Sequence, residues 1–390
     1  MYSQQLNKQL LVLMTATTGL VVANIYYNQP LLVLMTKTFN VNAVEISSVP
    51  MFTQIGYALG LFFVVPLGDK LKRKKLILTD FVFIIASLLF AAFSQSPLQL
   101  KIASFLIGFT SIVPQIIVPM AAQLASDEKR GAVIGTVMTG LLIGILGSRT
   151  VSGFAGEYFG WRSAFIVAAV LMILLFVMLL LWLPEMKPDF KGNYFSLLRS
   201  CVEQFRVLPK LRIACLRGGL NFGCFCLFWT TLTFLLSGPP FRMGSDVAGI
   251  MGLVGIAGAL GASGAGRLSD RMHKNTLIVV AVSTIMVSWI ILGFSATSMI
   301  GLVVGAFVLD FGVQSMHITN QTIILEGNPP ERSRINTMYM FMYFVGGALG
   351  TLVGGYLWHY FKWHGIVFAG FTWATLSLAI TLLFTKQSDK

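Results

Sequence analysis

The most informative ionisable residue is Asp310, which lies in a long apolar stretch that begins near Met299. If that stretch is a helix, Asp310 lies about eleven residues in, or ~16 Å deep at about 1.5 Å per residue. Gln314, His317 and Gln321 follow at helical spacing, so the four side chains share one face. A carboxylate this deep must pair with a cation or hold a proton. We therefore expect Asp310 to be the proton-responsive group, with His317 as a second titrating site. The alternative is a hydrogen-bond network that locks this helix.

Arg149 is the basic residue placed deepest in an apolar stretch, eight residues before Glu157 and ~12 Å from the expected helix end. An arginine is always charged and presents a planar fork of donors. Three interpretations follow. The fork binds a carboxylate or phosphate of a substrate, it forms a salt bridge with Asp310, or it extends along the helix to the membrane surface.

Amide and aromatic side chains recur in several other apolar stretches. Grouped around a central cavity, they suit a neutral or amphipathic organic molecule, although each alone is equally explained by core packing. No spacing typical of a metal site occurs among the histidines, cysteines and carboxylates. Together with Arg149, Gln314 and His317, the candidate substrate-binding residues are Asn24, Tyr27, Asn28, Gln54, Tyr57, Gln115, Asn221, Trp229, Tyr339 and Tyr343.

The elements that carry these residues are strongly apolar. Of 390 residues, 56% are hydrophobic and 11% charged, with a mean hydropathy of +0.78, whereas a soluble domain has about 25% charged residues. Because a membrane-spanning helix needs ~20 to 25 residues, we predict an all-α polytopic membrane protein with twelve transmembrane helices. The expected spans are residues 9–35, 45–67, 76–96, 98–124, 131–156, 162–183, 212–237, 247–268, 276–296, 299–325, 334–357 and 364–385.

The basic residues follow the expected loops rather than one patch. Of 28 Lys and Arg, 21 fall on the side that holds both termini and five on the other. This asymmetry predicts a multi-pass protein of the plasma (inner) membrane with both termini in the cytoplasm. Because the net charge of +13 is spread in this way, we expect no nucleic-acid partner.

The chain also repeats itself. Residues 67–70 resemble residues 268–271, and residues 158–161 resemble residues 360–363, at offsets near 202. A parallel repeat of this kind predicts two pseudo-symmetric six-helix bundles with a substrate site between them near the midplane. The expected domains are 1–183, a cytoplasmic linker 184–211, and 212–390.

Glycines recur every third or fourth residue in residues 249–264 and 346–354, and pairs occur within residues 56–60 and 140–144. Small residues let helix backbones approach closely in a membrane. These segments are the second and fifth helices of each expected half. We predict that they form the seam along which the halves move, with static packing as the alternative.

Two loop motifs resemble those of the major facilitator superfamily, whose inner loop reads G-x-L-x-D-R-x-G-R-[RK]. Residues 266–271 match its start, and residues 65–74 match in charge but lack both glycines. Within that superfamily, residues 24–32, 130–131 and 334–337 resemble the twelve-span drug and sugar efflux branch, a group of proton antiporters.

The resemblance implies export of small organic molecules by alternating access, driven by protons. It also implies that charged residues at the inner helix ends close the cytoplasmic side in one state, whereas orientation and solvation are the simpler explanation. These candidate gating residues are Asp69, Arg73, Asp270 and Arg271.

Other classes fit poorly. The sequence has no H-E-x-x-H, G-x-S-x-G or P-loop motif, so we expect neither an enzyme nor a nucleotide-driven pump, and no cofactor. The expected partners are a small-molecule substrate, protons and the lipid bilayer, with the protein working as a monomer. An importer or facilitator of a small metabolite or sugar, and a non-transporting membrane sensor, are the alternatives to export.

Overall fold

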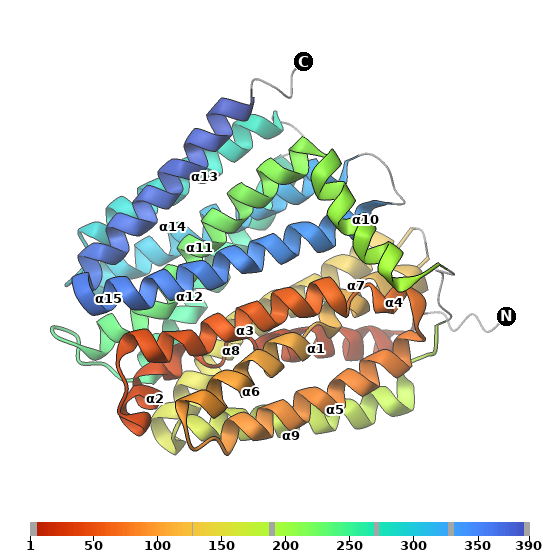
Figure 1. Ribbon diagram of the computed structural model, residues 1–390, viewed down its shortest axis with the longest axis horizontal. Helices are drawn as coiled ribbons and strands as arrows, with labels where there is room; N and C mark the ends of the chain where they lie inside the picture. Colours follow the sequence, from red (N-terminus) through yellow and green to blue (C-terminus); the bar gives the residue numbers. More distant parts are fainter. Residues whose placement is uncertain (1–5, 127, 187–191, 269–272, 327–330, 386–390) are drawn as a thin grey trace.

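A computed structural model of the protein describes residues 6–126, 128–186, 192–268, 273–326 and 331–385 (Figure 1). Every regular element within these ranges is a helix, which confirms the predicted all-α class. Side chains are described throughout except at residues 146, 256–257, 259–268 and 385.

The helices form two groups that lie one above the other in Figure 1. The first group comprises α1 (Lys8–Ala23), the short helix η1 (Gln29–Leu31), α2 (Leu32–Phe39), α3 (Ala43–Phe63), α4 (Leu67–Lys70), α5 (Arg73–Ala92), α6 (Pro97–Thr110), α7 (Val113–Leu124), α8 (Arg130–Phe159) and α9 (Trp161–Trp182). The second comprises α11 (Pro209–Ser237), α12 (Ser245–Leu268), α13 (Lys274–Gly293), α14 (Met299–Leu325) and α15 (Arg332–Thr385), and α10 (Tyr194–Val207) lies between the two in sequence.

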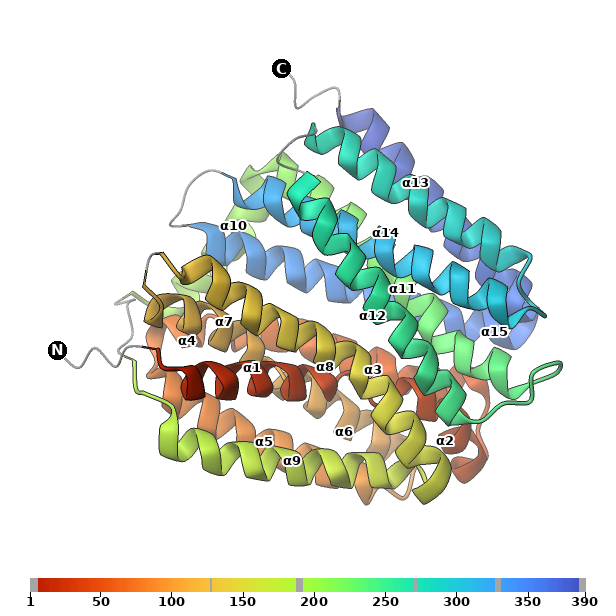
Figure 2. The same cartoon turned by 180° about the vertical axis from the view of Figure 1, so that it is seen from behind.

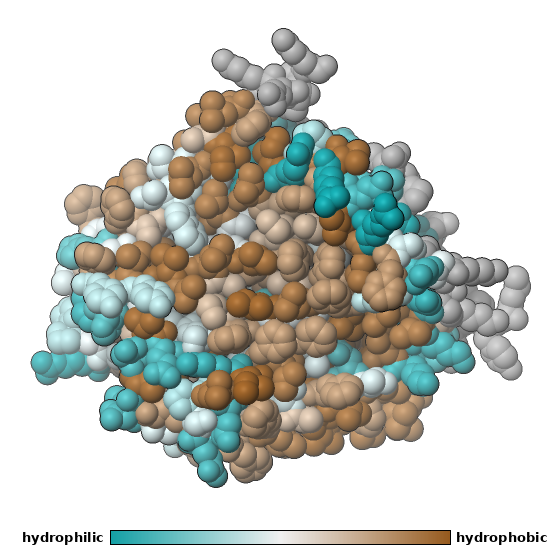
Figure 3. Space-filling model, viewed as in Figure 1, coloured by the Kyte–Doolittle hydropathy of each residue, from teal (hydrophilic) through white to brown (hydrophobic). Residues whose placement is uncertain are grey.

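All twelve predicted spans are present. Three of them are broken into shorter helices, namely α1–η1–α2, α3–α4 and α6–α7, while α15 contains the last two spans, joined at a bend at Lys362. Apolar side chains cover the middle of the surface in Figure 3, and hydrophilic ones gather towards its left and right margins, where the helices end. This distribution is that of a protein immersed in a bilayer.

The breaks occur beside prolines. In the first span, the turn between α1 and η1 precedes Pro30, which has no N–H to donate and whose ring clashes with the preceding turn of a helix. In the fourth span, α6 ends shortly before Pro114, which lies in the first turn of α7. A further proline, Pro119, lies inside α7 without ending it.

The predicted linker contains a helix that the sequence analysis did not anticipate. α10 buries Leu197 and Cys201 and packs against α15 and α11. At its start, the Tyr194 hydroxyl donates a 2.6 Å hydrogen bond to the Phe63 carbonyl at the end of α3. α10 therefore contacts both groups of helices.

The two groups meet along two pairs of helices, α3 with α15 and α8 with α12. Figure 2 shows α8 and α12 close together at one end and spread apart at the other. The spread end holds the start of α1, together with α4 and α10, and we call it the basic end. There, a Cβ added to Gly131 or Gly135 would have no described neighbour within 4 Å.

The predicted role of the glycines is mostly wrong. Side chains at Gly56 and Gly60 would collide with α6, and at Gly140 and Gly144 with α1, all within the first group. Similarly, Gly346 and Gly350 face the backbone of α11 within the second group. These glycines hold each group together internally, because a residue without a side chain permits close approach by whichever helix faces it.

A different glycine pair lies between the groups. A Cβ on Gly249 would meet the α8 backbone at Arg149, Thr150 and Gly153, and one on Gly153 would meet the α12 backbone at Ser245 and Gly249. We call this contact the glycine seam.

Candidate functional site

Arg149 lies between the two groups and is 1% exposed. Its Nε donates a 2.7 Å hydrogen bond to the Gln29 Oε1 in η1. Its guanidinium carbon lies over the ring of Trp229 at 4.3 Å, over that of Tyr26 at 5.0 Å and over that of Phe225 at 5.3 Å. The side chain therefore points inward among aromatic rings instead of reaching the membrane surface.

Asp310 contacts the edge of the same indole. The Trp229 Nε1 donates a 3.1 Å hydrogen bond to Asp310 Oδ1, and Asp310 is 1% exposed. A Cβ on Gly258 would touch the Asp310 side chain, so α12 covers it closely. Among the described residues Asp310 forms no ion pair, and the salt bridge to Arg149 considered above is not formed in this conformation.

Several buried polar atoms around these two charges have no hydrogen-bond partner within the described parts of the chain. They include both Nη atoms of Arg149, the Nε2 of Gln29 and the Oδ2 of Asp310. Arg149, Gln29 and Trp229 also line a cavity of ≈ 10 Å³, about enough for one water molecule. Unsatisfied buried groups are costly, so their concentration at one place indicates a functional site.

The break in the first span places its amides near this site. Asn28 donates to the Thr53 Oγ1 of α3 at 2.9 Å, and the Asn24 amide lies 3.6 Å from the Met172 sulfur of α9. The Oδ1 atoms of both asparagines find no described partner. Tyr27 is buried next to them within the first group. An unwound segment in mid-membrane is tolerated where it is buried in protein or lines a cavity.

Gln54 forms a polar bridge between the groups. From α3, its Nε2 donates to the Cys226 sulfur of α11 at 3.3 Å, and its Oε1 accepts from the Thr351 hydroxyl of α15 at 3.1 Å. The predicted candidate Gln54 therefore lies at the interface between the groups.

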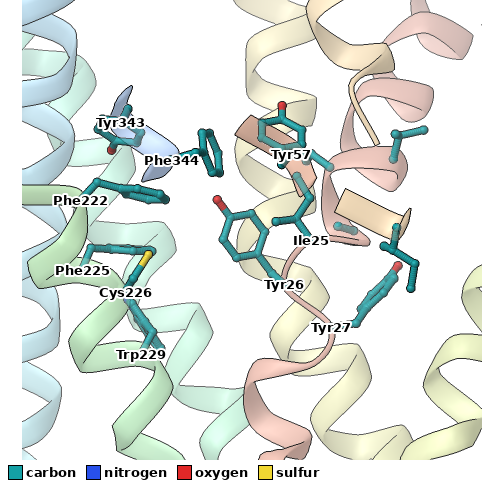
Figure 4. Close-up of a cluster of buried hydrophobic side chains, with 14 of the residues drawn as sticks. Ile25, Tyr26, Tyr27, Tyr57, Phe222, Phe225, Cys226, Trp229, Tyr343 and Phe344 are labelled. Atoms are coloured by element: carbon teal, nitrogen blue, oxygen red, sulfur yellow. The ribbon is translucent and has the colours of Figure 1, made fainter. Parts of the chain in front are cut away.

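Aromatic rings continue this interface towards the basic end. Figure 4 shows Tyr26 and Tyr57 of the first group facing Phe222, Tyr343 and Phe344 of the second. The rings of Tyr57 and Phe344 are 4.4 Å apart, and those of Phe222 and Tyr343 are 4.1 Å apart. Apolar and planar surfaces thus face each other across the centre of the protein.

Gln115 extends this surface, since its amide lies 3.5 Å from the Tyr57 hydroxyl.

The polar face of α14 serves two separate clusters instead of one. Asp310 contacts Trp229 of α11, whereas His317 Nδ1 lies 3.1 Å from the Tyr339 hydroxyl of α15. Gln321 donates to Asn336 at 3.1 Å, also on α15. Gln314, which lies between them, is half-buried. His317 is therefore not in hydrogen-bond contact with Asp310, because seven residues of helix separate the two side chains by ~10 Å.

Asn221 lies inside the second group. Its amide donates to the Ser377 hydroxyl at 2.7 Å and to the Arg217 carbonyl at 2.8 Å. Arg217 itself is buried and donates a 3.0 Å hydrogen bond to the Asn320 Oδ1 of α14. These residues connect α11, α14 and α15 of one group, so Asn221 is not brought together with the residues around Arg149.

The candidate gating residues are only partly described. Arg73 is buried, and it donates to the Gly68 carbonyl at 3.2 Å and to Gln123 at 2.6 Å, with Asp69 at 3.9 Å. These contacts hold α4, α5 and α7 of the first group together. Asp270 and Arg271 lie outside the described residues.

Asp69 also influences α10. The pKa of the Cys201 thiol is raised to about 11, mainly because the thiol is buried. Nearby charges have smaller effects: Arg334 of α15 lowers this pKa and Asp69 of α4 raises it. Charged residues from both groups thus act on one side chain of α10.

At the end opposite the basic end, hydrogen bonds reinforce the glycine seam. Glu157 Oε2 accepts from the Ser245 backbone N–H at 2.8 Å, and the Thr150 hydroxyl donates to the Gly249 carbonyl at 3.0 Å. The Thr233 hydroxyl of α11 donates to the Pro30 carbonyl at 3.3 Å. The groups are therefore joined at this end.

Sequence reasoning missed several residues of the site. Gln29 could have been noticed as a buried amide directly before Pro30, whereas Tyr26, Phe225 and Cys226 carry no signal that separates them from core residues. Asp80 of α5 was also missed. It is a buried carboxylate whose Oδ2 finds no partner in the described part of the chain.

Comparison with known proteins agrees with this architecture. The family model of the Major Facilitator Superfamily matches residues 13–327. An uncharacterized transporter, YgaY of Escherichia coli O157:H7, is 42% identical over 378 residues, covering 97% of this chain and 96% of that protein.

Two solved structures share the fold. A mutant of the nucleoside transporter NupG superposes with a TM-score of 0.77 at 16% identity, covering 97% of this chain and 99% of that one. A bacterial homolog of the human lysosomal transporter Spinster, in an inward-facing and occupied conformation, gives a TM-score of 0.77 at 12% identity, covering 97% and 96%. The family match and the 42% identical transporter YgaY confirm the prediction of a transporter rather than an enzyme. The chain belongs to the Major Facilitator Superfamily and is a multi-pass membrane transporter.

Proposed function

We propose that the protein exports small organic molecules across the plasma (inner) membrane by alternating access, coupled to the movement of protons. The moving units are residues 1–183 and 212–390, connected by residues 184–211, and the protein works as a monomer with both termini in the cytoplasm. The distribution of basic residues supports this orientation, since 21 of 28 fall on the side of the termini.

The observation that carries proton coupling is the environment of Asp310. It is a carboxylate in mid-membrane whose one described hydrogen bond comes from a neutral group, the Trp229 N–H. Among the described side chains, the charged or titratable groups that act on it are Arg149 of α8 and Tyr343 of α15, and Gly258 of α12 lies against its side chain. A buried carboxylate without a cation partner takes up a proton more readily than one held in an ion pair.

Alternating access is supported by the difference between the two ends of the interface. At the basic end the first turns of α8 are exposed, while the opposite end is held by the glycine seam and the Glu157–Ser245 contact. An open apolar groove of ≈ 190 Å³ lies along the α3–α15 contact. An interface whose hydrogen bonds lie at its centre and at the end opposite the basic end suits groups that rock against each other.

Export rests on the resemblance to the efflux branch, and one observation favours the second candidate, import. An anion at Arg149 and a proton on Asp310 would stabilise each other electrostatically, because both contact the same indole. Ligands that bind cooperatively are carried in the same direction, whereas exchange of substrate for protons requires competition between them.

Proteoliposomes loaded with a pH-sensitive dye test the coupling. Compounds that shift the unfolding temperature of purified protein are added to either face, and the change in internal pH is followed. Wild-type protein is expected to show substrate-dependent proton flux, and Asp310→Asn to lose it. Glu203→Gln on the exposed face of α10 is the matched control and keeps the flux.

Full proton-driven transport by Asp310→Asn would remove Asp310 from the mechanism. Direction is read separately, from accumulation in inside-out compared with right-side-out vesicles. Accumulation in right-side-out vesicles alone would replace export with import.

A further inference from the structure

We infer that the transported molecule carries an anionic group, a carboxylate or a phosphate, that binds to Arg149 and Gln29. This inference rests on the proposed transport function and names the chemical class of its substrate. Buried donor atoms of Arg149 and Gln29 face one small cavity and find no hydrogen-bond acceptor among the described residues.

Arg149 and Gln29 have buried donor nitrogens that find no described partner. A guanidinium has five N–H groups, and Arg149 uses the single one on Nε for Gln29, so both Nη atoms are free of partners in the described structure. Gln29 accepts that bond through Oε1, which leaves its own Nε2 unpaired. Three donor nitrogens, each buried, therefore lie around the cavity lined by both residues. Such a set of donors without an acceptor is complementary to an anion.

The surroundings of the Arg149 guanidinium also favour an anionic ligand. The guanidinium carbon lies over the rings of Trp229, Tyr26 and Phe225, so aromatic surfaces surround the group without accepting hydrogen bonds from its Nη atoms. The two Nη atoms remain for a ligand. Two parallel N–H groups at the edge of a guanidinium match the two oxygens of a carboxylate or phosphate.

Asp310 is the acid next to this site, but it is not the permanent partner of Arg149. Asp310 contacts the same indole through the Trp229 N–H and yet forms no ion pair with Arg149. The remaining side chains that line the cavity are neutral: Pro30, Leu232, Thr233 and Ala248. An unpaired buried charge is strongly unfavourable, so occupation by an anion would be favoured.

The body of the substrate is expected to be apolar or aromatic. In Figure 4 the rings of Tyr26 and Tyr57 face those of Phe222 and Phe344. The Tyr26 ring also lies 5.0 Å from the Arg149 guanidinium carbon, so it connects this aromatic surface to the proposed anion site. The cavity of ≈ 10 Å³ holds only one water, so binding must move η1 away from α11. The Thr233–Pro30 hydrogen bond, which joins these two elements at 3.3 Å, would break in that step.

Thermal unfolding of purified protein tests the inference with probes that differ in charge but little in shape. The probes are benzoate, its neutral isostere benzamide, and phenyl phosphate, with formate and formamide as a smaller pair. Wild-type protein is expected to be stabilised by benzoate or phenyl phosphate and not by benzamide, and the stronger of the two identifies the anionic group. Arg149→Gln is expected to bind the anion at least ~10-fold more weakly.

Arg162→Gln is the matched control. Arg162 also lies 4.3 Å over a tryptophan ring, that of Trp161, but it is only half-buried and donates to the Ser94 carbonyl. Its loss should leave the response to anions unchanged. Where Arg149→Gln does not fold, Arg149→Lys keeps the charge without the fork, and Gln29→Leu removes the neighbouring donor. Both are expected to weaken anion binding.

Equal stabilisation by benzoate and benzamide would overturn the inference, as would an unchanged anion response in Arg149→Gln. Absence of any anion-specific shift in the wild-type protein counts against it equally. These outcomes are separate from the test of proton coupling. A neutral or cationic substrate whose transport still needs Asp310 would leave the proposed function standing and the anion site refuted.

Discussion

Arg149 and Arg217 are both arginines buried within membrane-spanning helices, and their surroundings differ. Arg217 lies inside the second group, where its Nη2 donates to Asn320 of α14 and, of its buried nitrogens, only Nε is without a partner among the described residues. Arg149 lies between the groups, where its one hydrogen bond goes to Gln29 and both Nη atoms find no described partner. The first arginine joins helices that stay together, and the second faces a space between helices that we propose to move.

Burial of a charged side chain therefore does not by itself identify a functional residue. A buried charge with a partner in the same rigid unit contributes to the fold, and its removal leaves the partner unsatisfied. A buried charge whose donors face a cavity at an interface is available to a ligand. The glycines divide in the same way, since Gly346 packs within one group and Gly249 packs between the two.

The largest effect is expected from Gly346→Val. A side chain there would collide with the Gly219 backbone of α11, and neither helix can withdraw without disrupting the group. Overpacking of this kind costs about 1–3 kcal/mol, and more where backbone must shift. The unfolding temperature should fall clearly, and recovery of folded protein should fall with it. A variant as stable as the wild type would show that α11 and α15 are not a rigid pair.

Gly249→Val should separate the groups instead of unfolding the protein. Its side chain would collide with α8 across the glycine seam, and rocking of the groups relieves the collision. A bias of about 1–3 kcal/mol shifts the population of conformers ~5- to 150-fold. Spin labels at Tyr158→Cys and Tyr360→Cys, both exposed at this end, would report a longer distance.

Gly147→Val is the control for that measurement, since a Cβ at Gly147 of α8 meets nothing within 4 Å among the described atoms. The distance between labels should stay at its wild-type value there. An unchanged distance in Gly249→Val as well would mean that the seam does not close this end.

Arg217→Gln should lower stability and spare binding. It removes the 3.0 Å hydrogen bond to Asn320 and leaves that amide oxygen without its donor, a loss of about 1–3 kcal/mol. Thermal unfolding should show the loss, while the preference for benzoate over benzamide should persist. If Arg217→Gln abolished that preference, the distinction between the two arginines would fail.

The smallest effect is expected at an exposed pair. Lys274 lies 2.5 Å from Glu326, and this hydrogen bond lowers the pKa of the Glu326 carboxyl. Because the folded pKa lies below the unfolded one, the contribution to stability is present above the unfolded pKa and disappears as the pH falls through the folded pKa. Glu326→Gln should thus change the unfolding temperature slightly at pH 7 and not at all in strong acid. Exposed pairs contribute about 0–1 kcal/mol, so a shift as large as that of Arg217→Gln would contradict this ranking.

Much of the fold could be predicted from the sequence, since twelve apolar stretches define the spans and Pro114 marks a real break. The break before Pro30 was missed, although a proline in mid-span signals it. α10 was missed because its mean composition resembles a linker and its burial depends on contact with α15.

The candidate site was predicted less completely. Asp310, Arg149 and Trp229 were each named from depth and residue type, and the structure brings them together around one indole. Asp310 and His317 were expected to share one face of their helix, but their side chains contact different neighbouring helices. Spacing along one helix predicts which residues share a face, but it does not predict which neighbour each residue meets.

The sequence by itself determined that the protein is helical and membrane-embedded, and how deep its buried charges lie, because hydropathy and rise per residue are local properties. The contacts between elements follow from the tertiary structure alone: Gln29 accepts one hydrogen bond from Arg149, Trp229 donates to Asp310, and Gly249 rather than Gly346 lies between the groups. Those contacts join residues about 80 or more positions apart, and they depend on how each helix is rotated about its axis. A small rotation changes which atoms meet while hydropathy stays the same.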